Sequence, residues 1–423
     1  MTRIVHVTYS ASGGAGRAAL RLVEAQRAVG MDSVLAVPGA GASVGPVLSL
    51  GAMRWPRLRA HVDRLPVRKY ISRSVFAWWS NNFLPSRVAA AVRALAPDIV
   101  HLHWIGDGMV RPADFGRFGC PVVWTFHDMW AFTGGCHYVN SCRRFAEHCG
   151  ACPQLASSRE EDLSRSNFTR KESAWNDDAW TAICPSQWMA ACARLSPISR
   201  RKRIEVIAYA LPLDRFRPLD RQAARRHFGI GEHEVVLAAG AAGSLDDRRK
   251  GLVFLPEVVR LLKAMNNDRR VRLLLFGGSR VEIAGNDPVC IHHVGAIRGD
   301  HDLAQLYSAA DCVVVPSLQD NLPNIAIESI ACSTPVVGFD SGGLREIAGV
   351  SETGMVASDV SAEALAGALA TTLEYRENNP DAAIKCREFA ETRFSPDLIA
   401  RRHELLYRSL LADDRDGGVS ARA

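Results

Sequence analysis

The part of this chain that most restricts its fold runs from residue 311 to residue 347, with the sequence DCVVVPSLQDNLPNIAIESIACSTPVVGFDSGGLREI. Two short apolar segments, Cys312–Val315 and Pro335–Phe339, are each followed by a polar loop and a helix-forming run. Short apolar strands that alternate with helices are typical of a parallel sheet covered by helices. The stretch therefore predicts two βα units in tandem and an α/β fold.

The helix between these two strands is expected to begin at Pro323, because proline suits a first helical turn, where its missing amide hydrogen costs nothing. Asp320 and Asn321 precede it and are natural caps for the exposed amides. Asn324 and Glu328 lie four residues apart and share one helix face, near the end where ligands gather in open α/β sheets. Glu328 is thus predicted to accept hydroxyl protons of a sugar or ribose, and a buried βαβ unit without a ligand is the alternative.

At these positions the chain resembles the family 4 retaining glycosyltransferases. Their signature is an acidic residue, seven intervening residues and a glutamate, placed between Pro-Ser and Pro-Val-Val. Here Pro316–Ser317 comes first, Asp320 and Glu328 follow with the required spacing, and Pro335–Val337 closes the pattern. Two residues depart from the family, since Asp320 stands where glutamate is usual and Ser333 stands where glycine is usual. The aspartate keeps the charge and shortens its reach.

The resemblance implies a GT-B fold, with two Rossmann-like, doubly wound domains facing a cleft and a C-terminal helix crossing back to the first domain. The predicted domains are 1–205 on the acceptor side, 206–390 on the nucleotide-sugar donor side, and 391–423 as the crossover helix and tail. The linker is expected near Ile204–Pro218, where Tyr209–Ala210 replaces an Asn-Gly turn common in the family. A strand ending at Ser186 is expected to be the last of the first domain.

A glycine-rich segment follows the first predicted strand, Ile4–Thr8. Its Gly13, Gly14 and Gly16 let the backbone approach a ligand closely, and the amphipathic helix behind them aims its first amides at an anion. A bare tight turn is the alternative. In the resembled family this loop borders the cleft and touches the donor phosphate or the acceptor.

Another predicted strand, Pro121–Phe126, delivers His127 and Asp128 at its carboxyl end. A His-Asp pair beside a glycine turn is placed to hydrogen-bond a substrate, whereas a structural histidine is the alternative. The resemblance gives His127 a catalytic role beside the transferred hexose. The segment that follows, TGGCHYVNSCRRFAEHCGACPQL, resembles the subgroup that builds colanic-acid-type and other bacterial exopolysaccharides.

The predicted second domain holds the candidate donor-binding residues. Lys250–Gly251 matches a Lys-Gly of the family at a helix start, where the ammonium meets the donor diphosphate in a contact worth about 1.5–3 kcal/mol. The family has an arginine at the place of Ser244, so Arg248 or Arg249 would supply the second charge. An exposed charge run is the alternative. The other expected donor contacts are Asn324, Ser341, Gly342 and Gly343.

Four of the eleven cysteines lie in a predicted insertion, 132–155, and the last two form C-x-x-C. Thiols this close in a reducing compartment suggest a tetrahedral structural zinc site that staples a long loop. Buried free thiols or a redox-labile pair are the alternative. The four residues are Cys136, Cys142, Cys149 and Cys152.

Length and charge set the remaining expectations. A chain of 423 residues exceeds what one core usually supports, and a net charge of +6 fits phosphorylated substrates or an anionic membrane without indicating nucleic acid. The first ten residues lack a long apolar core, so the chain is expected in the cytoplasm. Basic and aromatic residues alternate over Arg54–Asn82, which suggests a solvated helix face or a peripheral contact with the inner face of the cell membrane.

The sequence thus predicts a hexosyltransferase that uses a UDP- or GDP-sugar and a glycan or polyprenyl-diphosphate-linked acceptor, in exopolysaccharide biosynthesis. The resemblance implies retention of configuration without a catalytic metal ion, and Glu328 and Asp320 join His127 as the catalytic residues. Two alternatives stay open. One is a GT-B nucleotide-sugar epimerase or phosphorylase, and the other is a non-catalytic nucleotide-sugar-binding subunit of a polysaccharide assembly complex.

Overall fold

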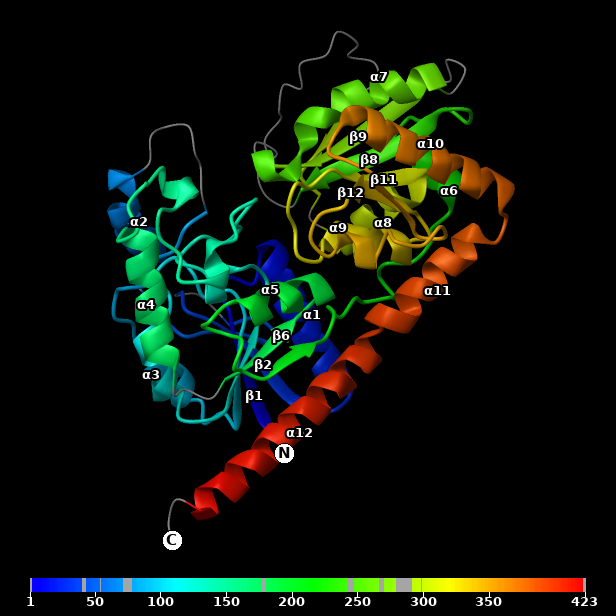
Figure 1. The fold of residues 1–423 in the computed structure, drawn as a ribbon. Helices are drawn as coiled ribbons and strands as arrows, with labels where there is room; N and C mark the ends of the chain where they lie inside the picture. The colour runs from blue at the N-terminus through cyan, green and yellow to red at the C-terminus, as the bar shows by residue number, and fades with distance from the viewer. Residues whose placement is uncertain are drawn as a thin grey trace. The chain divides into compact units, whose positions relative to one another are not determined.

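The computed structural model describes residues 2–39, 43–53, 55–70, 78–176, 180–241, 247–265, 270–278, 291–297 and 299–420, with side chains to residue 413. The chain forms two compact units (Figure 1). Unit 1 comprises residues 1–210 and 396–423, and unit 2 comprises residues 211–395. The predicted domain ends at residues 205 and 390 fall shortly before these two boundaries. Ser244 lies outside the described residues.

In the described part of unit 1, seven parallel strands form one sheet in the order β3-β2-β1-β4-β5-β6-β7. The strands are β1 (Arg3–Val7), β2 (Asp32–Val37), β3 (Val47–Ser49), β4 (Ile99–Leu102), β5 (Val122–Thr125), β6 (Trp180–Cys184) and β7 (Ile204–Val206). The helices are α1 (Gly13–Ala28), α2 (Pro56–Arg64), α3 (Val88–Arg93), α4 (Leu163–Trp175), α5 (Gln187–Leu195) and α12 (Pro396–Ser420).

Within the described residues of unit 2, six parallel strands form a second sheet, in the order β10-β9-β8-β11-β12-β13. The strands are β8 (Val235–Ala241), β9 (Val271–Gly277), β10 (Ile291–Gly295), β11 (Cys312–Val315), β12 (Val336–Phe339) and β13 (Gly354–Ala357). The helices are α6 (Arg221–His227), α7 (Leu255–Met265), α8 (Asp300–Ala309), α9 (Asn324–Ala331), α10 (Ala362–Asn378) and α11 (Ala382–Phe394). Two parallel, doubly wound sheets confirm the predicted fold class.

Helices cover both faces of each sheet. In unit 2, α7 and α10 pack together on one face, and α8 and α9 cover the other (Figure 1). In unit 1, α1 and α12 share a core with strands β1, β4, β5 and β6. The C-terminal helix therefore returns to the first unit, as predicted.

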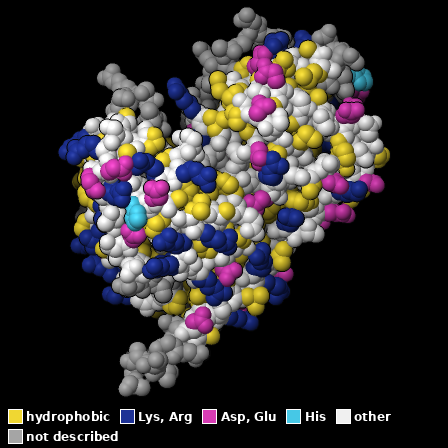
Figure 2. All heavy atoms as spheres, viewed as in Figure 1, with side chains coloured by type: hydrophobic (Ala, Val, Ile, Leu, Met, Phe, Trp, Pro, Cys, Tyr) yellow, Lys and Arg dark blue, Asp and Glu magenta, His cyan; other side chains and the backbone are white. Residues whose placement is uncertain are grey.

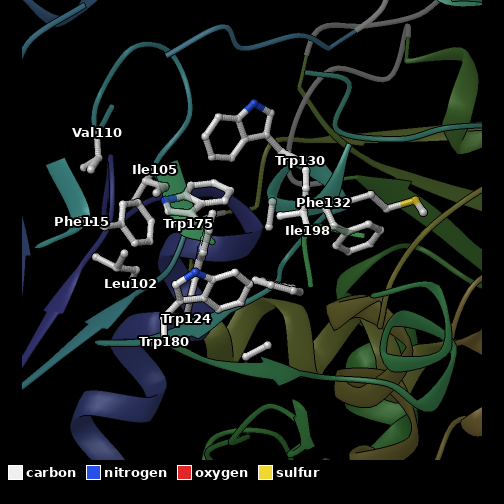
Figure 3. Close-up of a cluster of buried hydrophobic side chains, with 14 of the residues drawn as sticks. Leu102, Ile105, Val110, Phe115, Trp124, Trp130, Phe132, Trp175, Trp180 and Ile198 are labelled. Carbon is white, nitrogen blue, oxygen red and sulfur yellow. The ribbon is translucent and has the colours of Figure 1, made fainter. Parts of the chain in front are cut away.

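The opposite face of the unit 1 sheet is filled by aromatic side chains (Figure 3). Trp124 of β5 lies 5.4 Å from Trp175 of α4 and 5.8 Å from Trp180 of β6, measured between ring centroids, in edge-to-face geometry. Trp130 stands 5.9 Å from Trp124. Each such pair adds about 0.5–1.5 kcal/mol beyond the burial of its area, so this cluster fixes α4 and the segment after β5 against the sheet.

Two local predictions were wrong. β6 is not the last strand of unit 1, because β7 (Ile204–Val206) pairs with it inside the stretch expected to be a linker. β7 is only three residues long and half-buried at the sheet edge, so its apolar pattern is weak. Helix α9 begins at Asn324, with Pro323 at the N-cap position and no capping side chain. Asp320 is not a cap of this helix, since its carboxylate bonds instead to Lys250 and to the Asn321 amide.

Tyr407 gives a test of how α12 is anchored. Its buried hydroxyl accepts a hydrogen bond from Gln26 Nε2 at 3.1 Å and lies 2.6 Å from His101 Nδ1. Tyr407→Phe removes the partner of both groups, so we expect a loss of about 1–3 kcal/mol in the free energy of unfolding. Urea denaturation measures it, with Leu405→Ala as the control, because Leu405 is 67% exposed on the same helix. Equal stability of the two variants would contradict this anchoring role.

Candidate active site

In unit 2 the strand order reverses between β8 and β11, which is where open α/β sheets bind ligands. Both strands are parallel, so their carboxyl ends meet at one edge of the sheet. The chain after β8 leads to a short 3₁₀ turn, Arg248–Lys250, and the chain after β11 leads to Asp320. Two candidate segments about seventy residues apart in sequence are thereby brought together.

An ion pair joins these two loops. Lys250 Nζ lies 2.5 Å from Asp320 Oδ2, and Arg249 Nη1 lies 3.6 Å from the same oxygen. Burial by itself would raise the pKa of Asp320, but the charges of Lys250 and Arg249 and the hydrogen bonds to its oxygens outweigh burial, and the pKa is lowered. Asp320 is therefore ionised at neutral pH. It holds two cations at the switch point, the place between β8 and β11 where the strand order reverses.

The cationic turn is fixed to the Asp320 loop by main-chain contacts. Arg249 Nη1 donates to the Gln319 carbonyl at 2.8 Å, and the Leu318 amide donates to the Arg249 carbonyl at 2.7 Å. Gly251 adopts a positive φ of 64°, and a Cβ there would lie 1.9 Å from the Pro316 carbonyl oxygen. Only glycine allows the chain to pass this close, which explains the Lys-Gly pair.

The loop after β12 packs against the same segment. Gly342 has φ +61°, and a Cβ on it would lie 1.5 Å from the Asp320 carbonyl oxygen. The Gly343 amide donates to the Asn321 carbonyl at 2.7 Å, and the Ser341 hydroxyl donates to the Ser317 carbonyl at 2.5 Å. These predicted donor contacts therefore surround Asp320, and their role toward a diphosphate stays a prediction.

Glu328 and Asn324 occupy the first two turns of α9, as the spacing predicted. The Glu328 side chain has no exposed surface, and its Oε2 accepts a hydrogen bond from the Tyr307 hydroxyl of α8 at 2.9 Å. Asn324 is half-buried at the start of the helix. The Tyr307 contact fixes the orientation of the Glu328 carboxylate.

In unit 1, His127 follows β5 and is the outer member of a hydrogen-bonded chain. Its Nε2 lies 2.9 Å from His103 Nδ1, and its Nδ1 lies 3.0 Å from the Tyr209 hydroxyl. His103 Nε2 lies 2.9 Å from His6 Nδ1, and His6 Nε2 lies 2.8 Å from the Gln26 side-chain oxygen. The chain crosses the middle of the sheet, from β5 through β4 and β1 to α1.

Gln26 determines the direction of this chain. Its amide oxygen is an acceptor, so His6 carries its proton on Nε2 and offers Nδ1 as an acceptor. His103 then donates from Nε2, and by the same argument His127 donates from Nε2 to His103. His127 Nδ1 is left as an acceptor for the Tyr209 hydroxyl. Gln26 thus determines the tautomer of His127, the predicted catalytic histidine, through three successive hydrogen bonds.

Burial keeps these imidazoles neutral. It lowers the pKa of His6 to about 3 and the pKa of His127 to about 4, and it lowers the pKa of His103 well below the ordinary value. His101 and His403, packed beside them, have pKa values lowered by the same cause. His127 is therefore suited to neutral hydrogen bonding at physiological pH.

Asp128, the other member of the predicted His-Asp pair, is bonded to different groups. Its Oδ2 accepts from His137 Nδ1 at 2.7 Å and from Trp104 Nε1 at 2.8 Å, and its Oδ1 accepts from the Trp130 amide at 2.9 Å. Burial opposes ionisation, yet His137 and these hydrogen bonds lower the pKa of Asp128. Asp128 therefore organises the segment after β5.

The predicted glycine segment belongs largely to α1, which begins at Gly13. Gly13 has φ +76°, and a Cβ on Gly16 would lie 2.2 Å from the Ser10 carbonyl oxygen. Gly14 stands between them in the first turn. The glycines therefore let α1 start directly beside the carboxyl end of β1, where the order of this sheet also reverses.

Sequence reasoning missed the aromatic partners of these residues. Tyr9 follows β1 and Trp104 follows β4; their rings meet edge to face at 5.5 Å beside the switch point of unit 1. Tyr209 stacks on His127, with ring centroids 5.4 Å apart. The only available signal was the replacement of an Asn-Gly turn by Tyr209–Ala210. The four cysteines of the insertion line a separate cavity of unit 1.

Comparison with known families agrees with this arrangement. Residues 12–215 match the family described as Glycosyltransferase Family 4, and residues 236–375 match the family described as Glycosyl transferases group 1. Together these two matches span most of the chain, and they show a family 4-like protein of the glycosyltransferase class with a GT-B fold. Among the described residues, no helix is long and apolar enough to cross a membrane.

Individual relatives are more distant. A D-inositol 3-phosphate glycosyltransferase of Rhodococcus erythropolis is 30% identical over 178 residues, which are 40% of this chain and 40% of that protein. Sucrose-phosphate synthase from Thermosynechococcus elongatus has a TM-score of 0.71 at 22% identity, covering 98% of this chain and 100% of its own. Anabaena HepE in complex with UDP-glucose has a TM-score of 0.63 at 17% identity, covering 97% and 100%. These structural similarities concern the fold.

The buried histidines predict an acid-sensitive fold. His6 and His127 stay neutral in the folded protein down to pH values of about 3 and about 4, whereas in the unfolded chain they take up protons near pH 6.5. The unfolded state binds more protons between these values, so stability falls as the pH drops from about 6.5 toward 4. Calorimetry from pH 7.5 to 4.5 measures the fall in Tm. A flat Tm between pH 7 and 5 would refute the assignment.

Proposed function

We propose that the protein is a retaining hexosyltransferase, which moves a hexose from a UDP- or GDP-sugar to a glycan or lipid-linked acceptor in bacterial exopolysaccharide biosynthesis. The observation that carries this proposal is the Lys250–Asp320 ion pair at the switch point of unit 2, with Arg249 beside it. Such a site offers both cations for a diphosphate and a carboxylate for sugar hydroxyls.

In the proposed mechanism both members of the Lys250–Asp320 ion pair contact the donor. When the donor binds, its phosphate oxygens replace Asp320 as the partner of Lys250, with Arg249 as the second cation. Asp320 is then available to accept hydroxyl protons of the sugar. Negative charge develops on the departing nucleoside diphosphate, and the two preorganised cations stabilise it without a metal ion on the diphosphate. Glu328, oriented by Tyr307, is proposed to bind the ribose hydroxyls.

His127 is proposed to recognise the transferred hexose as a hydrogen-bond acceptor. Its Nε2 proton is committed to His103, and Nδ1 accepts from the Tyr209 hydroxyl. A sugar hydroxyl that replaces the Tyr209 hydroxyl would meet the same acceptor. The lowered pKa keeps the ring neutral, so the interaction persists across the physiological pH range.

The names of similar proteins support the choice of substrates to test. HepE, a structural neighbour, was solved with UDP-glucose, which supports a UDP-sugar as the first donor. Several similar curated proteins are D-inositol 3-phosphate glycosyltransferases, which favours a small phosphorylated acceptor as a second candidate. The acceptor series therefore includes inositol phosphates beside polyprenyl-diphosphate sugars.

A peripheral membrane contact is proposed at α2 and the turn after it. Trp55, Leu58 and Leu65 are exposed there, beside the exposed Arg57 and Arg68. Apolar side chains among cations suit an anionic bilayer surface, and Figure 2 shows Lys and Arg scattered between hydrophobic side chains over the visible face of unit 1. Flotation with vesicles rich in anionic lipid tests this contact. Equal binding to neutral vesicles, or none to either, would exclude it.

A panel of UDP- and GDP-sugars, each with and without the two acceptor classes, tests the function. We expect turnover only with an acceptor, and NMR of the product should show the anomeric configuration of the donor. Donor interconversion without an acceptor would indicate an epimerase instead. Tight donor binding without turnover, unchanged by lipid-linked acceptor, would indicate a binding subunit.

Glu328→Ala is the variant that tests the donor site. Removal of a carboxylate that holds the ribose should lower kcat/KM by about 100-fold, because a hydrogen bond to a charged group contributes about 1.5–3 kcal/mol and about 1.4 kcal/mol is a factor of ten. Glu363→Ala, on the exposed face of α10, is the matched control and should retain wild-type kinetics. Circular dichroism establishes that both variants are folded. Wild-type activity in the Glu328 variant would remove the main support for this site.

A further inference from the structure

The segment between β5 and α4, residues 126–162, is ordered without a strand or an α-helix of its own. Its regular structure consists of three short 3₁₀ turns, Trp130–Phe132, Arg144–Ala146 and Pro153–Leu155. Loops of this length usually need a function or an additional constraint to hold one conformation. A candidate for this constraint is the cavity that the cysteines of this segment line.

All four cysteines of the insertion line one cavity. Cys136, Cys142, Cys149 and Cys152 surround it, and no disulfide joins them. They come from three separate turns of the segment, so a common ligand would tie these turns together. Thiolate sulfur is the ligand that zinc prefers in structural sites, commonly in sets of four.

The backbone around the C-x-x-C pair is bent in a way that needs support. Cys149, Gly150 and Ala151 have φ values of +55°, +103° and +39° in succession. Two of the three carry a Cβ, so this conformation is strained, and such strain persists only where the surroundings impose it. Hydrogen bonds from the Gly150 amide to Ser164 and from the Cys152 amide to Asp162 hold this turn. The turn therefore carries Cys149 and Cys152 to the same cavity, where both can reach one ion.

Backbone amides face the sulfurs of this pair. The Gly134 amide faces the Cys149 sulfur, and the amides of Gln154 and Leu155 face the Cys152 sulfur. Donors in these positions favour a thiolate over a thiol.

A buried lysine holds the same segment against α4. The Lys171 side chain has no exposed surface, and its Nζ donates to the carbonyl oxygens of Trp130 and Thr133. These contacts place the start of the cysteine segment, so the cavity is bordered by fixed main chain on this side.

The other cluster of possible ligands is satisfied without an ion. His6, His101 and His103 are the described residues whose ligand atoms lie within 4.8 Å of one another in a group of three. Their nitrogens belong to the hydrogen-bonded network of Gln26 and Tyr407. The cavity of the four cysteines is separate from this network.

We propose that Cys136, Cys142, Cys149 and Cys152 bind one structural zinc ion as thiolates, and the four thiol protons are released on binding. Four thiolates leave no open coordination position, so the ion has no role in the chemical step. The zinc ion would hold the segment that positions Asp128, the residue that follows His127. Cys136 is followed by His137, whose Nδ1 binds Asp128 at 2.7 Å and whose Nε2 binds the Ser80 hydroxyl at 2.8 Å.

The metal content of the full-length protein, purified without chelator, tests the proposal independently of transferase activity. Native mass spectrometry and elemental analysis should give one zinc per chain, and a mercurial reagent should release it as the thiols react. The double variant Cys149→Ser, Cys152→Ser should lose the zinc. Cys192→Ser is the control and should keep it, because Cys192 lies in α5, outside the cavity.

Three results would overturn the proposal. They are wild-type protein that is folded and free of metal, a mass that is lower by two hydrogens for each disulfide, and bound iron in place of zinc. If the double variant fails to fold, mercurial release from the wild-type protein still decides the question, because it needs no variant. Retention of full zinc by a folded double variant would also exclude this site.

Discussion

All neighbouring strands that the described residues form in the two sheets are parallel, and this constraint determines where chemistry can occur in the protein. Parallel strands place all their carboxyl ends at one edge of the sheet, and each return crossing takes a helix to one of the two faces. Where the order reverses, two neighbouring loops diverge and leave space for a ligand. The Lys250–Asp320 pair in unit 2 and the Tyr9–Trp104 contact in unit 1 both occupy such points.

The two units handle buried polar groups in opposite ways. Unit 2 retains charge, because Asp320 stays ionised between Lys250 and Arg249. Unit 1 removes charge, because burial keeps the histidines around His127 neutral and their hydrogen bonds run in one direction from Tyr209 to Gln26. A neutral, directional chain gives its outer histidine a fixed tautomer, which a lone exposed imidazole lacks.

Local sequence patterns were sufficient where the residues of one segment determine its structure. The apolar run Cys312–Val315 is β11 with the predicted bounds, and the strand expected at Pro121–Phe126 is β5 (Val122–Thr125). The patterns failed where a contact with a distant segment determines the local structure. Strand β7 exists because β6 offers it an edge, and Asp320 does not cap α9 because Lys250 competes for its carboxylate.

The sequence by itself determined the alternation of strands and helices, the spacing of Asp320 and Glu328 and the clustering of the cysteines, because these are properties of short stretches with fixed periodicity. Only the tertiary structure decided what these residues contact. Tyr209 reaches His127 across 82 residues, and Tyr407 reaches Gln26 across 381. The packing of strands and helices brings these partners together, and a local sequence pattern contains no information on such contacts.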